Sequence, residues 1–357
     1  MPQPDAPTRA APSTRYLTLE AARFIAALFV AVGHLSDFSA LLGRGKMPLG
    51  FSLPPIISVL FFFVLSGFVI QTAHGKDTGQ KALLRYGWRR FCRLFPLYWL
   101  SLLVPLYFLL RVTPPLNLIE NLTLSPFASP HLQELNPPAW SLRFELTYYL
   151  MFWFMLLKRV RTPLILFWLT AITVHWLRGI YGIKVQLLFG HWQDGFDMRF
   201  LGVHGFLFLA GMGAAALHAR LRLPAKLLWA LLGLSLALLI ALMPVQDWGY
   251  AYPPAALEPL TGLLLGGLIL ALAGLERGGH LRLPGWCAWL GAMSYPLYLI
   301  HASVSFLAGY EIAFVHPHAP RPATFLLFLV LLLAALALAA IIALIDKPFQ
   351  RLARRLI

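Results

Sequence analysis

Apolar segments of about twenty residues recur along this chain from its beginning to its end. A helix needs roughly that length to cross the ~30 Å hydrocarbon core of a bilayer, and 59% of the residues are hydrophobic while 12% are charged. We therefore predict an all-α, polytopic transmembrane helix bundle with about ten spans. The predicted spans lie near residues 17–36, 53–73, 94–112, 140–157, 162–178, 201–219, 224–243, 255–275, 285–309 and 323–345.

The distribution of positive charge predicts how this bundle is oriented. With the N-terminus inside, twenty of the 29 lysines and arginines fall in cytoplasmic segments, six fall on the opposite side, and three fall within spans. Cytoplasmic loops carry an excess of Lys and Arg, so we expect both termini in the cytoplasm and a multi-pass protein of the cytoplasmic (inner) membrane. The net charge of +15 then reflects topology, and no nucleic-acid partner is expected.

A single integral membrane domain is expected. Residues 1–14 are rich in Pro, Ala and Thr and are predicted to form a disordered cytoplasmic tail, which leaves residues 15–357 as the domain. No cleavable signal is expected, because the first apolar segment is long enough to span and contains Arg23. Cys92 and Cys287 both fall on the predicted cytoplasmic side, which argues against a structural disulfide.

Two ionisable residues lie on one face of the first predicted span. Arg23 and His34 are eleven residues apart, so at 100° per residue they project from nearly the same face, about 16 Å apart along the axis. Glu20 lies on much the same face. Intramembrane charge is costly and marks a functional site by default, and a histidine is the natural general base for activating a hydroxyl. The alternative is a buried histidine that only satisfies a neighbour.

A basic loop follows the second predicted span. Within it, Arg90 and Arg93 are i, i+3 neighbours, so both guanidinium groups can reach one partner if the segment is helical, and paired forks suit phosphate. The alternative is that these arginines only set topology or contact anionic lipid.

Ser66 and Gly67 interrupt an aromatic run late in the second predicted span. Small residues there let a backbone or a slender ligand approach closely, and helix packing is their more common role. A nucleophilic role for Ser66 has no adjacent base in the sequence to support it.

Glu145 lies in a segment that begins after Pro137 and Pro138. The prolines allow a new helix to begin near Trp140, and Glu145 then enters the membrane from the outer side, at the level predicted for His34. Two readings follow: a carboxylate paired with Arg143, or a carboxylate that orients His34.

A second polar stripe occupies the ninth predicted span. Ser294, Tyr298 and His301 follow i, i+4 and i+7 spacing, and Pro296 can bend this helix. In a predicted outer loop, the side chains of His191, Asp194 and Asp197 are of the types that bind metals. Nothing in the sequence fixes a ligand geometry, and we expect no metal.

Taken together, these segments resemble the acyltransferase-3 family of integral membrane acyltransferases. The matching pieces, in chain order, are Leu19 through Arg23 to His34, Phe62 through Ser66 to Phe68, Arg90 and Arg93 with Pro96 and Trp99, Trp140 through Glu145, Phe208 through Met212, Ser294 through His301, and Asp346 through Phe349. One departure is that the family commonly has Asp-Gly-Leu where this chain has Glu20, Ala21 and Ala22. The carboxylate is kept and the glycine is lost.

The resemblance implies a chemistry and a role for each residue. Members move acyl groups, often acetyl, from cytoplasmic acyl-CoA onto hydroxyls of surface or secreted glycans, and this chain resembles the stand-alone type. Acyl-CoA is then a donor substrate rather than a tightly bound cofactor, and membrane lipid surrounds the enzyme. His34 and Glu145 are the expected catalytic residues; the donor is expected at Arg23, Ser66, Arg90 and Arg93, and the acceptor at Ser294, Tyr298 and His301.

Two other functions compete with an O-acyltransferase acting on an envelope polysaccharide or its lipid-linked precursor. Buried Arg, Glu and His also suit a secondary transporter of an acyl or organic anion, although the sequence shows none of the inverted repeats that favour transport. A non-catalytic scaffold in an export complex predicts that His34 is replaceable.

Overall fold

The computed structural model describes residues 15–44, 48–50, 55–109, 115–128, 132, 134–181, 197–242, 256–315, 318 and 322–355. The predicted disordered tail lies outside these residues. Within them every regular element is a helix, and Arg44 and Ala323 form an isolated bridge. The elements are α1 (Leu17–Leu42), α2 (Ile56–His74), α3 (Gln80–Leu109), α4 (Pro115–Thr123), α5 (Ala139–Met155), α6 (Lys158–Ile180), η1 (Asp197–Leu201), α8 (His204–Arg220), α9 (Ala225–Leu242), α10 (Glu258–Arg277), α11 (Cys287–Tyr310), η3 (Glu311–Val315) and α12 (Thr324–Arg355).

The prediction of an all-α, multi-pass membrane bundle is confirmed. In the described part of the chain, eight helices are long and apolar enough to cross a membrane: α1, α2, α6, α8, α9, α10, α11 and α12. The other two predicted spans correspond to α3, which begins in the basic segment, and to α5, which has 17 residues. The count of ten spans and the cytoplasmic termini stay predictions.

Several helices extend beyond their predicted spans, and the extensions of α1 and α3 bear on predicted site residues. α1 runs to Leu42 rather than ending near residue 36, so His34 lies about 12 Å before the end of the helix. α3 begins at Gln80. Arg90 and Arg93 therefore stand on a helix that continues into the bundle.

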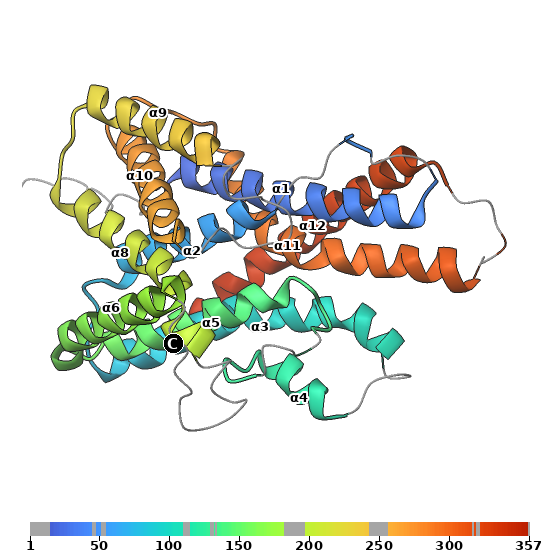
Figure 1. The fold of residues 1–357 in the computed structure, drawn as a ribbon, viewed down its shortest axis with the longest axis horizontal. Coiled ribbons are helices and arrows are strands. Elements are labelled where there is room, and N and C mark those ends of the chain that lie inside the picture. The colour runs from blue at the N-terminus through green and yellow to red at the C-terminus, as the bar shows by residue number, and fades with distance from the viewer. Residues whose placement is uncertain are drawn as a thin grey trace, which may run out of the picture.

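Two helix pairs form the closest packing. α1 and α11 run side by side with α12, and α2 crosses α8 (Figure 1). At that crossing a Cβ on Gly67 would overlap the backbone of Phe208, and one on Gly211 would overlap the backbone of Val64. The packing role of Gly67 explains the small residue in the aromatic run, because small residues let helix backbones touch within a membrane.

The helices differ in how far neighbours cover them. For each helix, we compare the share of an apolar 18-residue stretch that is buried inside the protein. This share is 78% in α11, against 11% in α6 and 17% in α9. α9 lies at the edge of the bundle beside α10 (Figure 1). α11 therefore forms the centre of the fold, and α6 and α9 present most of their surface outward.

Candidate active site

A cavity of about 760 Å³ lies between α1, α2, α3, α5, α11 and α12. This volume is in the range typical of ligand sites, about 300–1,000 Å³. Among its lining residues, the cations outnumber the three carboxylates of Glu20, Glu145 and Asp346. The cationic lining residues are Arg15, Arg23, Arg89, Arg90, Arg93, Lys347 and Arg351. The cavity therefore suits an anion.

Arg90 and Arg93 line the cavity together, as their spacing predicted. The Arg90 guanidinium lies 5.4 Å from the ring centre of Tyr86 and 5.3 Å from that of Tyr149, and Arg93 lies 5.2 Å from that of Tyr295. The aromatic faces hold the cations by cation–π contacts while leaving N–H groups for another partner.

Those N–H groups are unpartnered in the described structure. Arg90 Nε and Arg93 Nη2 are both buried and have no hydrogen-bond partner among the described residues. Arg93 Nη1 lies 3.9 Å from an Asp346 carboxylate oxygen, which is beyond hydrogen-bond distance. Leaving charged donors buried and unpaired is costly. A bound anion would satisfy them.

Arg23 adds a third guanidinium from α1. It lines the cavity, where the charges of Arg93, Glu20 and Glu145 act on it. The Glu20 carboxylate accepts a hydrogen bond of 2.9 Å from Arg15 Nε, and Arg15 also lines the cavity. Glu20 also packs against Gly291, where a Cβ would overlap the carboxylate. The longer acidic side chain in this position thus has room because its neighbour on α11 is a glycine.

Glu145 joins the arginine cavity, which corrects its expected partner. Ser66 Oγ donates a hydrogen bond of 3.0 Å to Glu145 Oε1, and the Tyr149 hydroxyl donates to the same oxygen. No hydrogen bond joins Glu145 to His34 among the described residues, so the expectation that Glu145 orients His34 is wrong. Residue spacing along α5 could not show that the Glu145 carboxylate faces Ser66 on α2 rather than His34 on α1.

Arg143 does not pair with Glu145 either. Its guanidinium is fully buried and donates to both carboxylate oxygens of Glu134, at 2.6 and 2.9 Å. It also donates to the backbone carbonyls of Glu120 and Ser125. Arg143 therefore anchors the segment between α3 and α5, which is a structural role.

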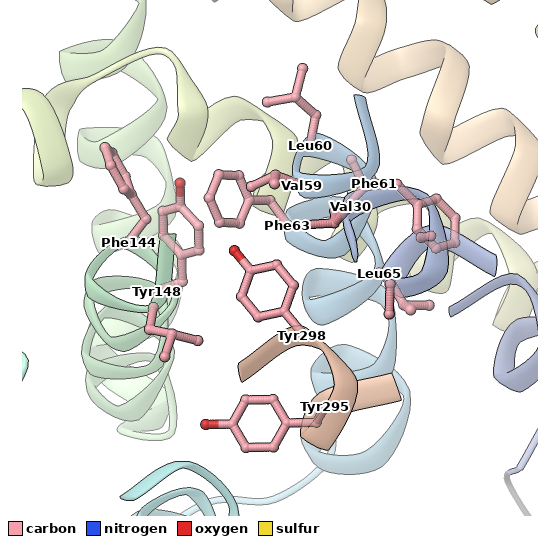
Figure 2. Close-up of a cluster of buried hydrophobic side chains, with 14 of the residues drawn as sticks. Val30, Val59, Leu60, Phe61, Phe63, Leu65, Phe144, Tyr148, Tyr295 and Tyr298 are labelled. Carbon is pink, nitrogen blue, oxygen red and sulfur yellow. The ribbon is translucent and has the colours of Figure 1, made fainter. Parts of the chain in front are cut away.

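Ser294 and Tyr298 of the second polar stripe also reach the cavity. The Tyr298 hydroxyl lies 2.6 Å from Ser141 Oγ, and Ser294 Oγ donates to the Gly291 carbonyl at 2.7 Å. Tyr295 and Tyr298 project from α11 toward α5 (Figure 2). The Tyr298 ring meets the His301 ring edge-on, with centroids 6.2 Å apart. Tyr298 thus separates the cavity from His301.

His34 and His301 lie beyond Tyr298 and face each other. His34 Nδ1 is 3.0 Å from His301 Nε2. Neither histidine lines the arginine cavity. The structure therefore divides the predicted site into two parts: Arg23, Ser66, Arg90, Arg93, Glu145, Ser294 and Tyr298 in the cavity, and the two histidines past its Tyr298 wall.

Sequence reasoning missed the contribution of α12. Asp346, Lys347 and Arg351 line the cavity, and Gln350 Nε2 donates to the Cys92 carbonyl at 2.8 Å. The available signal in the sequence was the resemblance of Asp346 through Phe349 to the family, which assigned no role to these residues. Among the described residues, no group of three His, Cys, Asp or Glu could hold a metal, and the side chains of His191, Asp194 and Asp197 lie outside that description.

Comparison with known proteins places the chain in a family. The model of an acyltransferase domain, the acyltransferase-3 family, matches residues 16–344. "Protein 2 in picA locus" of Rhizobium radiobacter is 35% identical over 101 residues, which are 28% of this chain and 48% of that protein, so the match spans about half of that relative. No solved structure gave a significant match. With that family match, which favours an enzyme over a transporter or a scaffold, the protein belongs to the acyltransferase-3 family and is a membrane acyltransferase.

Proposed function

We propose that this enzyme is an O-acyltransferase of the cytoplasmic membrane. It takes an acyl group, with acetyl as the expected one, from cytoplasmic acyl-CoA. It transfers that group to a hydroxyl of an envelope or secreted polysaccharide, or of the lipid-linked precursor. This assignment combines the family of the chain with the charge and shape of the cavity.

The unpartnered donors of Arg90 and Arg93 carry the donor assignment. Coenzyme A is a polyanion at its nucleotide end and a slender, uncharged arm at its thioester end. Buried guanidinium N–H groups on a cation-rich wall suit the phosphates. The phenyl and tyrosyl lining contributed by Phe62, Phe63 and Tyr298 suits the arm.

The position of the histidines supports the acceptor step. The arm would extend from the arginines toward Tyr298, and the Tyr298 ring contacts His301, which pairs with His34. As the base, His34 takes the proton of the acceptor hydroxyl while that oxygen attacks the thioester carbonyl. The carbon–sulfur bond then breaks, and the coenzyme A thiolate leaves and takes the proton back from the His34 imidazolium, so that the ester and free coenzyme A are the products. A positioned base of this kind contributes about 10²–10⁴-fold.

Binding of radiolabelled acetyl-CoA to the purified protein in nanodiscs tests the donor site. We expect an Arg90→Ala, Arg93→Ala double variant to lose most of this binding while remaining folded. Arg85→Ala is the matched control, because Arg85 is an exposed residue of α3 outside the cavity. Unchanged binding by the double variant would remove the donor site from this cavity.

A further inference from the structure

The hydrogen bonds of His301 determine which of its ring nitrogens carries the proton. His301 Nδ1 lies 3.1 Å from the backbone carbonyl oxygen of Leu297. A carbonyl oxygen only accepts hydrogen bonds, so Nδ1 must be the donor. In neutral imidazole the second nitrogen is then an acceptor. His301 Nε2 therefore presents a lone pair.

That lone pair determines the tautomer of His34. His301 Nε2 lies 3.0 Å from His34 Nδ1, and two lone pairs cannot hydrogen-bond each other, so His34 Nδ1 carries the proton. The ring planes lie within 14° of parallel, with centroids 5.2 Å apart. Because the two nitrogens are only 3.0 Å apart, closer than the planes of stacked rings, the rings meet through their nitrogen-bearing edges. The lone pair of neutral His34 is consequently on Nε2, which has no hydrogen-bond partner among the described residues.

The burial of the two rings separates their roles. His301 is 1% exposed, whereas His34 is only partly buried. A residue sealed inside the bundle cannot meet a glycan hydroxyl, but a partly exposed one can. The geometry thus leaves His34 Nε2 as the basic atom that an acceptor can reach.

We propose that His301 is a positioning residue that holds His34 in the Nδ1–H tautomer and supports its protonated form. This role rests on the proposed function, and it replaces the expectation that His301 binds the acceptor. When His34 Nε2 takes the hydroxyl proton, His34 becomes an imidazolium. Its Nδ1–H then donates a charge-assisted, stronger hydrogen bond to His301 Nε2.

A neutral histidine in this position has a physical advantage over a carboxylate. In hydrolases with a Ser-His-Asp triad, a buried carboxylate orients the histidine. A permanent buried charge is expensive at membrane depth. An imidazole fixed by the Leu297 carbonyl orients His34 without adding a charge to the resting site.

Three variants test this role in inverted membrane vesicles, where the donor side is accessible. Transfer of label from radiolabelled acetyl-CoA to the endogenous glycan gives an apparent kcat and KM. His301→Leu removes the acceptor for His34 Nδ1–H and should lower kcat at least about tenfold with the donor KM unchanged. His301→Gln should restore most of kcat, because its amide oxygen can accept that hydrogen bond. His34→Gln should be inactive with either His or Leu at position 301.

His280→Leu is the control, since His280 is an exposed histidine outside the site, and it should leave both constants unchanged. If His301→Gln is folded yet as impaired as His301→Leu, the positioning role is wrong. A fully active His301→Leu variant would also show that the positioning role is wrong. Activity retained by His34→Gln, or no transfer by the wild type, would instead overturn the proposed function and the positioning role with it.

Discussion

Gly67 of α2 and Phe208 of α8 meet backbone to backbone. A Cβ at Gly67 would overlap the Phe208 carbonyl oxygen, and the nearest atoms are all main chain. Main-chain atoms cannot rotate away as a side chain can, so this crossing fixes how close α2 comes to α8. Because Ser66 precedes Gly67, the crossing also fixes where Ser66 meets Glu145.

Gly67→Ala should destabilise the protein. The added methyl group has no room to settle, and overpacking of this kind costs about 1–3 kcal/mol or more. Gly213→Ala is the matched control, because nothing lies within 4 Å of a Cβ there. Alanine is the better helix former by about 1 kcal/mol, so that variant should melt at the same temperature or higher. Thermal unfolding in detergent measures both, and equal melting temperatures would contradict this reading of the crossing.

Arg93→Lys should weaken acetyl-CoA binding even though the positive charge remains. Lysine lacks the planar fork that lets arginine place one N–H toward a ligand while its face rests on Tyr295. Loss of one charge-assisted hydrogen bond corresponds to about a tenfold rise in Kd. Arg85→Lys should leave Kd unchanged. A lysine variant that binds with wild-type affinity would reduce the role of Arg93 to that of a point charge.

Arg143→Ala should lower stability without touching donor affinity. The change leaves Glu134 and two backbone carbonyls without their buried partner, and breaking a buried pair in this way costs about 3–5 kcal/mol. Melting temperature and acetyl-CoA Kd separate the two effects, with exposed Arg159→Ala as control. A weaker Kd in the folded fraction would mean that Arg143 acts on the cavity.

The predicted orientation is checked with reporter fusions at Gln80 and Ser125. The excess of cytoplasmic Lys and Arg predicts that residue 80 is inside and residue 125 outside, so the two fusions should report opposite compartments. The same answer from both would mean that α3 does not cross the membrane, and His34 would then need a new assignment to a side.

The fold class and the shared direction of Arg90 and Arg93 could be predicted because both depend on local pattern. Apolar length gives the helices, and the spacing of Arg90 and Arg93 on one helix gives their shared direction. The partners could not be predicted in this way. Ser66 and Glu145 are 79 residues apart, and His34 and His301 are 267 apart. Helical periodicity sets the direction in which a side chain points but not which helix lies there.

The first helix was predicted to end too early for a related reason. Asp37 and Ser39 lower the hydropathy that follows His34, and the predicted span accordingly ended near residue 36. In the structure Ser39 is fully buried, and α1 continues past it to Leu42. Polar residues that face neighbouring helices are indistinguishable, in a single sequence, from polar residues at a membrane surface.

The unequal covering of the helices has a consequence for how the enzyme responds to its lipid surroundings. A bilayer that thins or thickens acts on helices that face it, and they relieve the mismatch mainly by tilting. α6 and α9 face the bilayer most, because only 11% and 17% of their apolar stretches are buried. α11 faces the bilayer least, with 78% of its apolar stretch buried. The outer helices can therefore absorb changes in membrane thickness before these disturb the 3.0 Å separation of the two imidazoles. Turnover should accordingly stay constant over a range of lipid chain lengths that measurably changes the tilt of α6 and α9.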